Sequence, residues 1–421
     1  MSLRPASASD LLIDGKLIPG SGGVFDVINP ATEEVIGQAA DATVDDMDAA
    51  IAAARHAFDT TNWSRDATFR AHCLRQLRDA LLAHTDELRE LTVAEVGCPV
   101  FLTHGPQLEG PIRDLGYFAD LAESYEWTHD LGEAKPMGIR NTREIRKEAV
   151  GVVGAITPWN FPHQINFAKI GPALAAGCTV VLKPAPDTPW CAALVGKVIA
   201  EETDFPPGVV NIVTSSDNAL GAQLSTDPRV DIVSFTGSTA TGKKVMAAAS
   251  ESLKKVFLEL GGKSPVIVGE GADITRTTER VALGKMLNAG QICLAPDYML
   301  VRPEQEEAVV AGLKSAASAM YPTLLANPDY TAIINDRHHQ RLTDWVEDAR
   351  SKGARVEVVN PANEDFTATN SRKMPLTIVR DVTDDMTLMQ EEIFGPVLPI
   401  RRYDSLDGAI DLVNRRDRPL A

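Results

Sequence analysis

The chain has 421 residues, 44% hydrophobic and 24% charged, with a formal net charge of −17 at pH 7. This length exceeds what one hydrophobic core usually supports, so we expect a globular protein with two or more domains. The negative charge argues against a nucleic-acid partner, because nucleic-acid binders usually carry a basic surface. The longest mostly apolar run, 170–182, is too short to span a bilayer, so no membrane partner is expected.

Cysteine usage and the N-terminus predict a cytoplasmic protein. An odd number of cysteines, with no CxxC pair and no histidine at metal-ligand spacing, indicates a reducing compartment and no structural zinc or other metal site. Residues 1–10 lack the apolar core of a signal peptide. His338 and His339 are expected in a solvated segment. The five cysteines are Cys73, Cys98, Cys178, Cys191 and Cys293.

The first part of the chain, 1–147, begins with strand-and-turn signals and continues with helical patterns. Thr43 and Asp46 resemble a capping box for a helix over 44–58, and a longer amphipathic helix is expected over 67–96. The polar segment 131–147 is expected to be an extended hairpin that leaves the first domain.

From residue 149 the pattern alternates between strand and helix. Repeated βα units imply a parallel sheet with helices on both faces, and ligands bind such sheets at the carboxyl ends of the strands. Among the helices, 189–202 has Thr188 as its cap and a proline in its first turn. Short β-branched or apolar runs predict strands at 149–156, 178–182, 209–213, 231–235 and 255–260.

After Gly262 a second series of elements predicts a second α/β domain. Its strands are expected near 264–268, 298–301 and 376–379, and its helices near 274–287 and 305–320.

Cys293 and Glu259 are the best clue to chemistry. A thiol nucleophile and a carboxylate that activates water are what a reaction through a thioester needs. Taken alone, Cys293 between Ile292 and Leu294 is first a small buried hydrophobe. Glu259 lies between two leucines and before two glycines, where a buried carboxylate tends to have a raised pKa, which suits a general base.

Other segments suggest a ligand site, although each alone has a simpler explanation. The run 231–242 is a strand leading into a Gly/Ser/Thr turn, which suits a phosphate or is simply a capped helix start. Asn160, between two prolines, suits an oxyanion donor or a rigid turn. Lys183, at a strand end, suits a coenzyme hydroxyl or solvent, and Glu392 suits ribose hydroxyls or a plain loop.

Together, and in this order, these segments resemble the aldehyde dehydrogenase superfamily over nearly the whole chain. The resemblance implies a Rossmann-like α/β coenzyme domain at 1–130 and 148–261, an oligomerisation hairpin at 131–147 and an α/β catalytic domain at 262–421. It implies Cys293 as the nucleophile, Asn160 as the oxyanion donor and Glu259 as the base that hydrolyses the thioester. The coenzyme-binding residues implied are Ile156, Thr157, Pro158, Trp159, Lys183, Gly221, Phe235, Thr236, Gly237, Ser238, Gly242, Leu260, Glu392 and Phe394.

The activity implied is oxidation of an aldehyde to a carboxylic acid with NAD, and the full-length form is expected to be a homodimer or homotetramer. Many NAD-preferring relatives carry a glutamate where this chain has Pro186, so NADP stays open as the coenzyme. The alternatives within enzymes are an acylating or ester-hydrolysing relative. Phe161, Ile292 and Leu294 suggest an apolar pocket lining without naming the aldehyde.

Relatives in the superfamily continue beyond the position of Ala421. The resemblance therefore implies a C-terminally shortened chain, which we expect to bind coenzyme but to turn over slowly and assemble poorly. A coenzyme-binding protein without turnover is the corresponding alternative.

Overall fold

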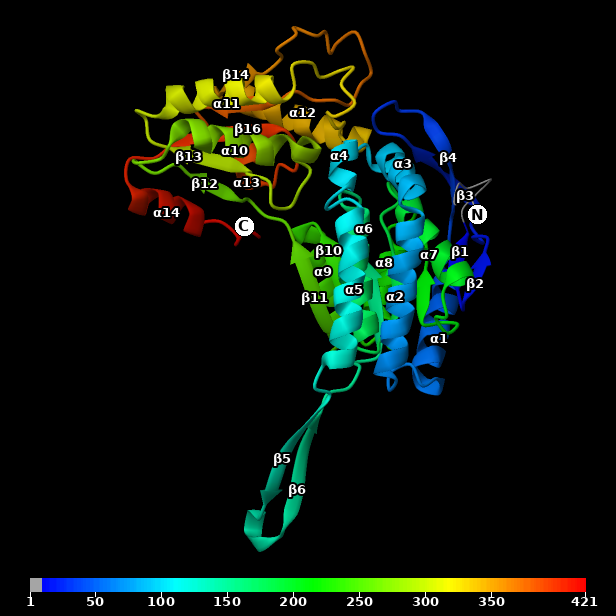
Figure 1. The fold of residues 1–421 in the computed structure, drawn as a ribbon. Helices are drawn as coiled ribbons and strands as arrows, with labels where there is room; N and C mark the ends of the chain where they lie inside the picture. The colour runs from blue at the N-terminus through cyan, green and yellow to red at the C-terminus, as the bar shows by residue number, and fades with distance from the viewer. Residues whose placement is uncertain (1–9) are drawn as a thin grey trace.

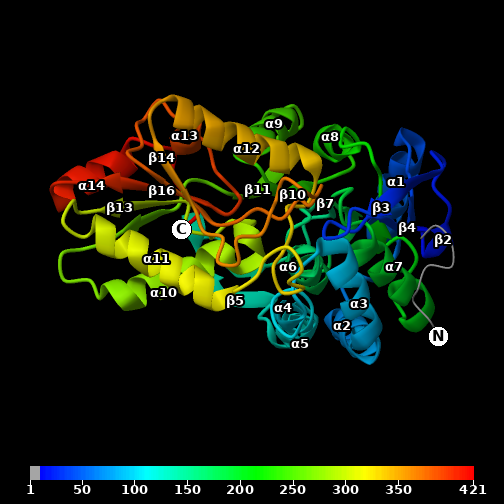
Figure 2. The same ribbon diagram turned by 90° about the horizontal axis from the view of Figure 1, so that it is seen from above.

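The computed structural model has two sheets, each covered by helices, and a hairpin that projects from the body (Figure 1). The structure describes residues 10–421, so the predictions on residues 1–9 lie outside the described residues. We call residues 10–261 the first unit and residues 262–421 the second unit. Figure 2 shows the two units side by side, with α11 and α14 toward one end and α1 and α7 toward the other.

The first unit is built on a seven-stranded sheet of order β11-β10-β7-β8-β9-β1-β2. Strands β7 to β11 run parallel, whereas β1 pairs antiparallel with β9 and β2. The strands of the unit are β1 (Leu11–Ile13), β2 (Lys16–Ile18), β3 (Val24–Ile28), β4 (Val35–Ala40), β7 (Val152–Ile156), β8 (Thr179–Lys183), β9 (Val210–Ile212), β10 (Ile232–Gly237) and β11 (Lys255–Leu260). Its helices are α1 (Val44–Thr60), α2 (Ala67–Ala83), α3 (Thr85–Val96), α4 (Val100–Thr103), α5 (Glu109–Ser124), α6 (Pro162–Ala175), α7 (Trp190–Glu202), α8 (Leu220–Thr226) and α9 (Thr239–Ser250).

Helices cover both faces of this sheet, as the strand–helix alternation predicts. On one face α2, α5, α6 and α7 form a core that includes Leu77, Leu115 and Phe167. On the other face α1, α8 and α9 pack around Ile51 and Leu224. Because the central strands are buried on both sides, their side chains are almost all apolar.

The second unit contains a five-stranded sheet of order β12-β13-β16-β15-β14, in which only β14 runs antiparallel to its neighbour. Helices α10 and α11 cover one face and α12, α13 and α14 the other. Its strands are β12 (Pro265–Ile267), β13 (Tyr298–Val301), β14 (Arg355–Val358), β15 (Thr377–Arg380) and β16 (Val397–Arg402). Its helices are α10 (Ile274–Met286), η2 (Leu287–Gly290), α11 (Glu306–Met320), α12 (Asp336–Ser351), α13 (Thr387–Gln390) and α14 (Leu406–Asn414).

The hairpin consists of β5 (Thr128–Ala134), the turn η1 (Pro136–Gly138) and β6 (Asn141–Arg146). It begins three residues before the predicted start at Leu131. Figure 1 shows it extending away from both units, so both of its faces are open.

Two predictions on helices are wrong. The helix expected over 67–96 is two helices that meet at His84, where the backbone leaves the helical region. The Thr85 hydroxyl donates to the carbonyl of Leu82 at 2.7 Å, and Asp86 and Glu87 lie in the first turn of α3, where acidic residues favour a new helix start.

The second wrong prediction is the cap of α7. Thr188 does not cap this helix, and its buried hydroxyl has no partner among the described residues. The carboxylate of Glu95, from α3, instead accepts the N–H groups of Trp190 and Cys191 at 2.6 and 2.9 Å. A carboxylate distant in sequence therefore does what the local threonine is expected to do.

Within residues 10–421, none of the helices combines the length and the apolar character needed to cross a membrane.

Candidate active site

Asn160 is held rigidly between the two units. It follows β7 in the loop before α6, whose first turn begins with Pro162, and it is buried. Its side-chain Nδ2 donates to the carbonyl of Gln291 at 3.0 Å. Its backbone carbonyl accepts from Gln107 Nε2 at 2.8 Å and from Asn288 Nδ2 at 3.3 Å. One hydrogen of the Asn160 amide group is thus used to fix its orientation, and the second is left for another acceptor.

The loop that carries Cys293 is shaped by backbone strain and by a buried glutamine. Asn288 and Ala289 have φ values of 49° and 53°, which non-glycine residues adopt rarely. Gln291 Nε2 donates to the carbonyl of Ala332 at 3.1 Å, and its Oε1 accepts from the N–H of Ile334 at 3.0 Å. Cys293 is half-buried, whereas the other four cysteines are buried. The one partly accessible thiol therefore lies on a rigid, strained turn.

Glu259 lies near the end of β11, opposite Thr236 of β10. It is half-buried, so the expectation of a buried carboxylate is wrong, because β11 is the edge strand of its sheet. Burial is the main cause that raises the pKa of Cys293, and the negative charges of Glu392 and Glu259 raise it further. Both carboxylates are therefore close enough to Cys293 to act on it electrostatically.

Glu392 lies against the backbone that follows Glu259. A Cβ atom built on Gly261 would lie 2.1 Å from Glu392 Oε1, so a larger residue at 261 would displace the Glu392 carboxylate. Burial raises the pKa of Glu392 to about 7, although a hydrogen bond from the Gly262 N–H opposes this shift. The structure therefore places this carboxylate beside the Glu259 segment.

The segment around Glu392 is anchored by buried charges. Asp297 Oδ1 accepts from the N–H of Ile393 at 3.0 Å, and Asp297 also forms a buried ion pair with Lys263. Lys263 Nζ donates to the carbonyl of Glu391 at 3.1 Å, and Arg341 donates to the carbonyl of Ile393 at 2.7 Å. These contacts fix the loop to the nucleophile segment, because Asp297 lies four residues after Cys293.

The predicted coenzyme residues of the first unit lie at the carboxyl ends of its parallel strands, whereas Glu392 and Phe394 come from the second unit. Ile156 pairs with Lys183 and with Phe235, so the ends of β7, β8 and β10 are level. Thr236 and Gly237 finish β10, and Ser238 caps α9 by accepting from the Thr241 N–H at 3.3 Å. The N-terminus of α9 therefore lies next to these strand ends.

The geometry at these strand ends fits a dinucleotide. The Thr157 hydroxyl is buried without a partner among the described residues, so a polar ligand group would satisfy it. A Cβ on Gly242 would lie 2.6 Å from Leu260, so α9 approaches β11 as closely as it does because residue 242 is glycine. Gly221 packs beside Ile156 and Lys183.

Aromatic contacts join the two units next to the ends of these strands. The Trp159 ring lies 5.5 Å from that of His338 and 5.6 Å from that of Phe394, and Pro158 precedes it in the same loop. His338 and His339 are partly buried on α12 and not in a solvated segment. Burial and the neighbouring Arg341 lower the pKa of His338 to about 4, so its imidazole is neutral at pH 7.

Sequence reasoning missed Gln107, Asp297, Arg341 and Asp217 as residues of this region. Asp297 directly follows Pro296 in the segment quoted for Cys293, and a charged residue there was a usable signal. Gln107 carries no such signal, because its partner Asn160 is distant in sequence.

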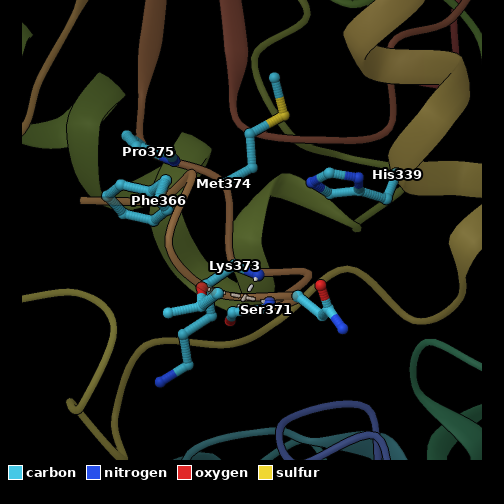
Figure 3. A pocket seen from close by; sticks show the side chains of 8 residues that line it. His339, Phe366, Ser371, Lys373, Met374 and Pro375 are labelled. Carbon is cyan, nitrogen blue, oxygen red and sulfur yellow. Dashed lines mark hydrogen bonds between the residues drawn. The ribbon is translucent and has the colours of Figure 1, made fainter. Parts of the chain in front are cut away.

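A separate hollow of about 240 Å³ lies in the second unit (Figure 3). It contains none of the predicted site residues. The ammonium of Lys373, one of its lining residues, is already bound by the carbonyls of Leu324, Leu325 and Asn327. We therefore assign no chemistry to it. Its lining residues are His339, Phe366, Thr369, Asn370, Ser371, Lys373, Met374 and Pro375.

The model of the aldehyde dehydrogenase family matches residues 18–421. The chain belongs to the aldehyde dehydrogenase family. A coniferyl aldehyde dehydrogenase from a Pseudomonas species is 46% identical over 277 residues, which are 65% of this chain and 56% of that enzyme. The mitochondrial succinate-semialdehyde dehydrogenase of Arabidopsis thaliana is 37% identical over 414 residues, 96% of this chain and 75% of that enzyme.

Solved aldehyde dehydrogenase structures have the same fold. Betaine aldehyde dehydrogenase from Staphylococcus aureus, in complex with NAD+, has a TM-score of 0.89 at 29% identity, covering 97% of this chain and 81% of that one. The predicted family and fold class are therefore confirmed. The matches span about half the length of the coniferyl aldehyde dehydrogenases, 55% and 56%.

Proposed function

We propose that the chain oxidises an aldehyde to a carboxylic acid with NAD as the hydride acceptor. The observation that carries this proposal is the position of Cys293. Its partly accessible thiol is on a rigid turn that Asn160 contacts through the Gln291 carbonyl, and the Glu259 carboxylate is near enough to shift its pKa. We assign the roles of nucleophile, amide donor and base to these three residues, which come from three distant segments.

In the first half of the reaction, the Cys293 thiol loses its proton to water, and its sulfur forms a bond to the aldehyde carbon. The carbonyl oxygen becomes an oxyanion, which accepts the second hydrogen of the Asn160 amide group. When NAD is bound, it supplies the acceptor for the hydride that leaves this carbon. The product on Cys293 is a thioester.

In the second half, Glu259 removes a proton from water, and the resulting hydroxide attacks the thioester carbon. The carbon–sulfur bond breaks, the carboxylic acid leaves and Cys293 is regenerated. The half-buried position of Glu259 suits this role, because a base must meet both water and the reacting carbon.

For coenzyme binding, the proposal assigns the phosphates to the α9 N-terminus at Gly237 and Ser238, and a ribose to Lys183. Thr157 offers a buried hydroxyl to the same ligand. The NAD+ complex of the S. aureus relative supports NAD as the coenzyme. We propose Phe161 and Ile292 for the aldehyde pocket wall, and Leu294 is largely exposed beside them.

The test is to mix the chain with NAD and a panel of aromatic and aliphatic aldehydes, and to record formation of NADH. We expect NADH with at least one aldehyde, loss of that signal in Cys293→Ala, and retained NAD binding by calorimetry. Cys98→Ala is the matched control, because burial raises the pKa of Cys98 to about 12 and keeps it inert. Activity retained in Cys293→Ala would overturn the proposal.

A further inference from the structure

Lys183 occupies an acidic environment that its own segment does not explain. Lys183 is 2% exposed, and within the described residues its ammonium donates one hydrogen bond, to the carbonyl of Pro184 at 3.3 Å. Pro186 supplies no carboxylate. A buried ammonium at a strand end can bind either a ligand hydroxyl or a ligand phosphate. The charged side chains near the ammonium determine which of the two ligands binds more tightly.

A neighbouring loop brings a carboxylate to this lysine. Strands β8 and β9 are parallel neighbours, with Leu182 opposite Ile212, so the loop between β9 and α8 leaves the sheet beside Lys183. Helix α8, which follows this loop, packs beside the lysine at Gly221, where a Cβ would lie 3.7 Å from Lys183 Cδ. Asp217 is in this loop, and its charge acts on Lys183 more strongly than that of any other carboxylate.

The loop is fixed by further hydrogen bonds. Asp217 Oδ1 accepts from the Ala219 N–H at 2.7 Å, which holds the Asp217 carboxylate at the start of α8. Asp41, between β4 and α1, accepts from the Ser216 N–H at 2.9 Å and from its hydroxyl at 2.6 Å. Asp41 therefore tethers the loop and adds a second negative charge near Lys183.

The third carboxylate near Lys183 is that of Asp187, which contacts the second unit. Asp187 accepts from Asn335 Nδ2 of the second unit at 2.8 Å. That contact joins the two units at the N-terminus of α12, and the Asp187 charge acts on Lys183 more weakly than those of Asp217 and Asp41.

We propose that Asp217, with Asp41 behind it, makes this chain select NAD over NADP by repelling a 2′-phosphate at Lys183. The inference rests on the proposed coenzyme site. A ribose 2′-hydroxyl is neutral and accepts or donates a hydrogen bond beside a carboxylate, whereas a 2′-phosphate adds negative charge there. Asp217 would thus repel the 2′-phosphate in place of a carboxylate at position 186.

The experiment measures binding and not turnover. Dissociation constants of NAD, NADP, 5′-AMP and 2′,5′-ADP are determined by calorimetry without aldehyde, for the unmodified chain and for Asp217→Asn. We expect tighter binding of NAD than of NADP in the unmodified chain, and a preference at least about tenfold smaller in Asp217→Asn. The preference for 5′-AMP over 2′,5′-ADP should fall by the same factor, because these two ligands differ only in the 2′-phosphate on the ribose.

Two controls sharpen the result. Glu251→Gln makes the same charge change at the other end of α9, away from the strand ends, and should leave the preference unchanged. In the unmodified chain, added salt should reduce the preference, because Asp217 is exposed and its repulsion is screened. This salt series needs no substitution and therefore tests the inference even if a variant folds poorly.

An Asp217→Asn variant that keeps the full NAD preference, or a preference that salt does not alter, would overturn the inference while leaving the proposed function intact. Failure of the unmodified chain to bind NAD at all would instead overturn the proposed coenzyme site. Preference for NADP in the unmodified chain would likewise contradict the inference.

Discussion

The reactivity of Cys293 depends on the carboxylates around it. Its pKa is raised by burial and by the charges of Glu392 and Glu259, so the thiol is largely protonated near neutral pH. Replacing Glu259 by glutamine removes one of these charges and should lower the pKa of Cys293. We therefore expect the rate of alkylation by iodoacetamide to rise with pH, and the midpoint to move to lower pH in Glu259→Gln.

The control for this titration is Glu251→Gln, which should leave the midpoint where it is in the unmodified chain. Cys293→Ala identifies the signal that belongs to the nucleophile. An unchanged midpoint in Glu259→Gln would mean that the two side chains do not interact.

Gln107 is expected to position Asn160 without contacting the aldehyde. Its amide group is buried and donates to the Asn160 carbonyl at 2.8 Å, so Gln107→Leu leaves a buried carbonyl with a weaker set of donors. We expect the rate of the first NADH burst to fall by about tenfold. The dissociation constant of NAD should change little, whereas general damage to the fold would weaken NAD binding as well.

A second variant tests whether a hydrogen-bond donor at position 107 restores the burst rate. Gln107→Glu provides a donor only when its carboxyl group is protonated, so its burst rate relative to the unmodified chain should recover as the pH is lowered. A burst rate that is equally slow at all pH values in Gln107→Glu would refute the positioning role.

At the scale of elements, Glu95 links α3 to the start of α7. Burial raises its pKa to about 7, from an ordinary value of 4.5. The folded chain therefore holds a proton on Glu95 between these values that the unfolded chain releases. The resulting stability is present in full below about pH 4.5 and is lost as the pH rises toward 7.

Glu95→Gln removes this titration. The free energy of unfolding of Glu95→Gln relative to the unmodified chain should therefore increase as the pH rises from 4.5 to 7, measured by urea unfolding. Glu201→Gln, on the exposed end of α7, should show a flat difference over the same range. A flat difference for Glu95→Gln as well would show that Glu95 does not hold its proton in the folded chain.

Elements with strong local signals could be predicted from the sequence. Strands β11 and β13 have the predicted bounds, and Thr43 and Asp46 form the expected capping box. Helix α12 was not predicted, although Leu342, Trp345, Val346 and Ala349 follow a helical spacing after the cap Asn335. A local signal for this helix was therefore present in the sequence.

The candidate site shows the same division. Asn160, Glu259 and Cys293 stand in distinctive local segments, and the family that these segments suggested is confirmed, although the roles stay predictions. Gln107 and Asp217 could not be predicted, because their proposed roles depend on Asn160 and Lys183, which are near them only in the folded chain. Pairing across long sequence separations is set by topology, which a local pattern does not contain.

At the scale of the whole molecule, the hairpin is the element that the two units do not cover. Ile139 is 66% exposed and Ile145 47% exposed on a hairpin that projects from the body (Figure 1). Exposed apolar side chains on such an element suit contact with a second copy, in line with the predicted homodimer or homotetramer. Ile139→Glu with Ile145→Glu should therefore reduce the mass measured by light scattering.

Val44→Glu, at an equally exposed position in the first turn of α1, is the control and should leave the mass unchanged. A monomeric unmodified chain, or an unaltered mass in the hairpin variant, would argue against this use of the hairpin.

The central claim is a thioester on Cys293 that Glu259 hydrolyses. Rapid mixing of Glu259→Gln with NAD and an accepted aldehyde tests it most directly, because acylation needs no water. We predict one burst of NADH per site, steady turnover reduced by about 10²–10⁴, and a Cys293 mass increased by the aldehyde minus two hydrogens. Loss of the burst, unchanged turnover, or an unmodified Cys293 after the burst would contradict the account.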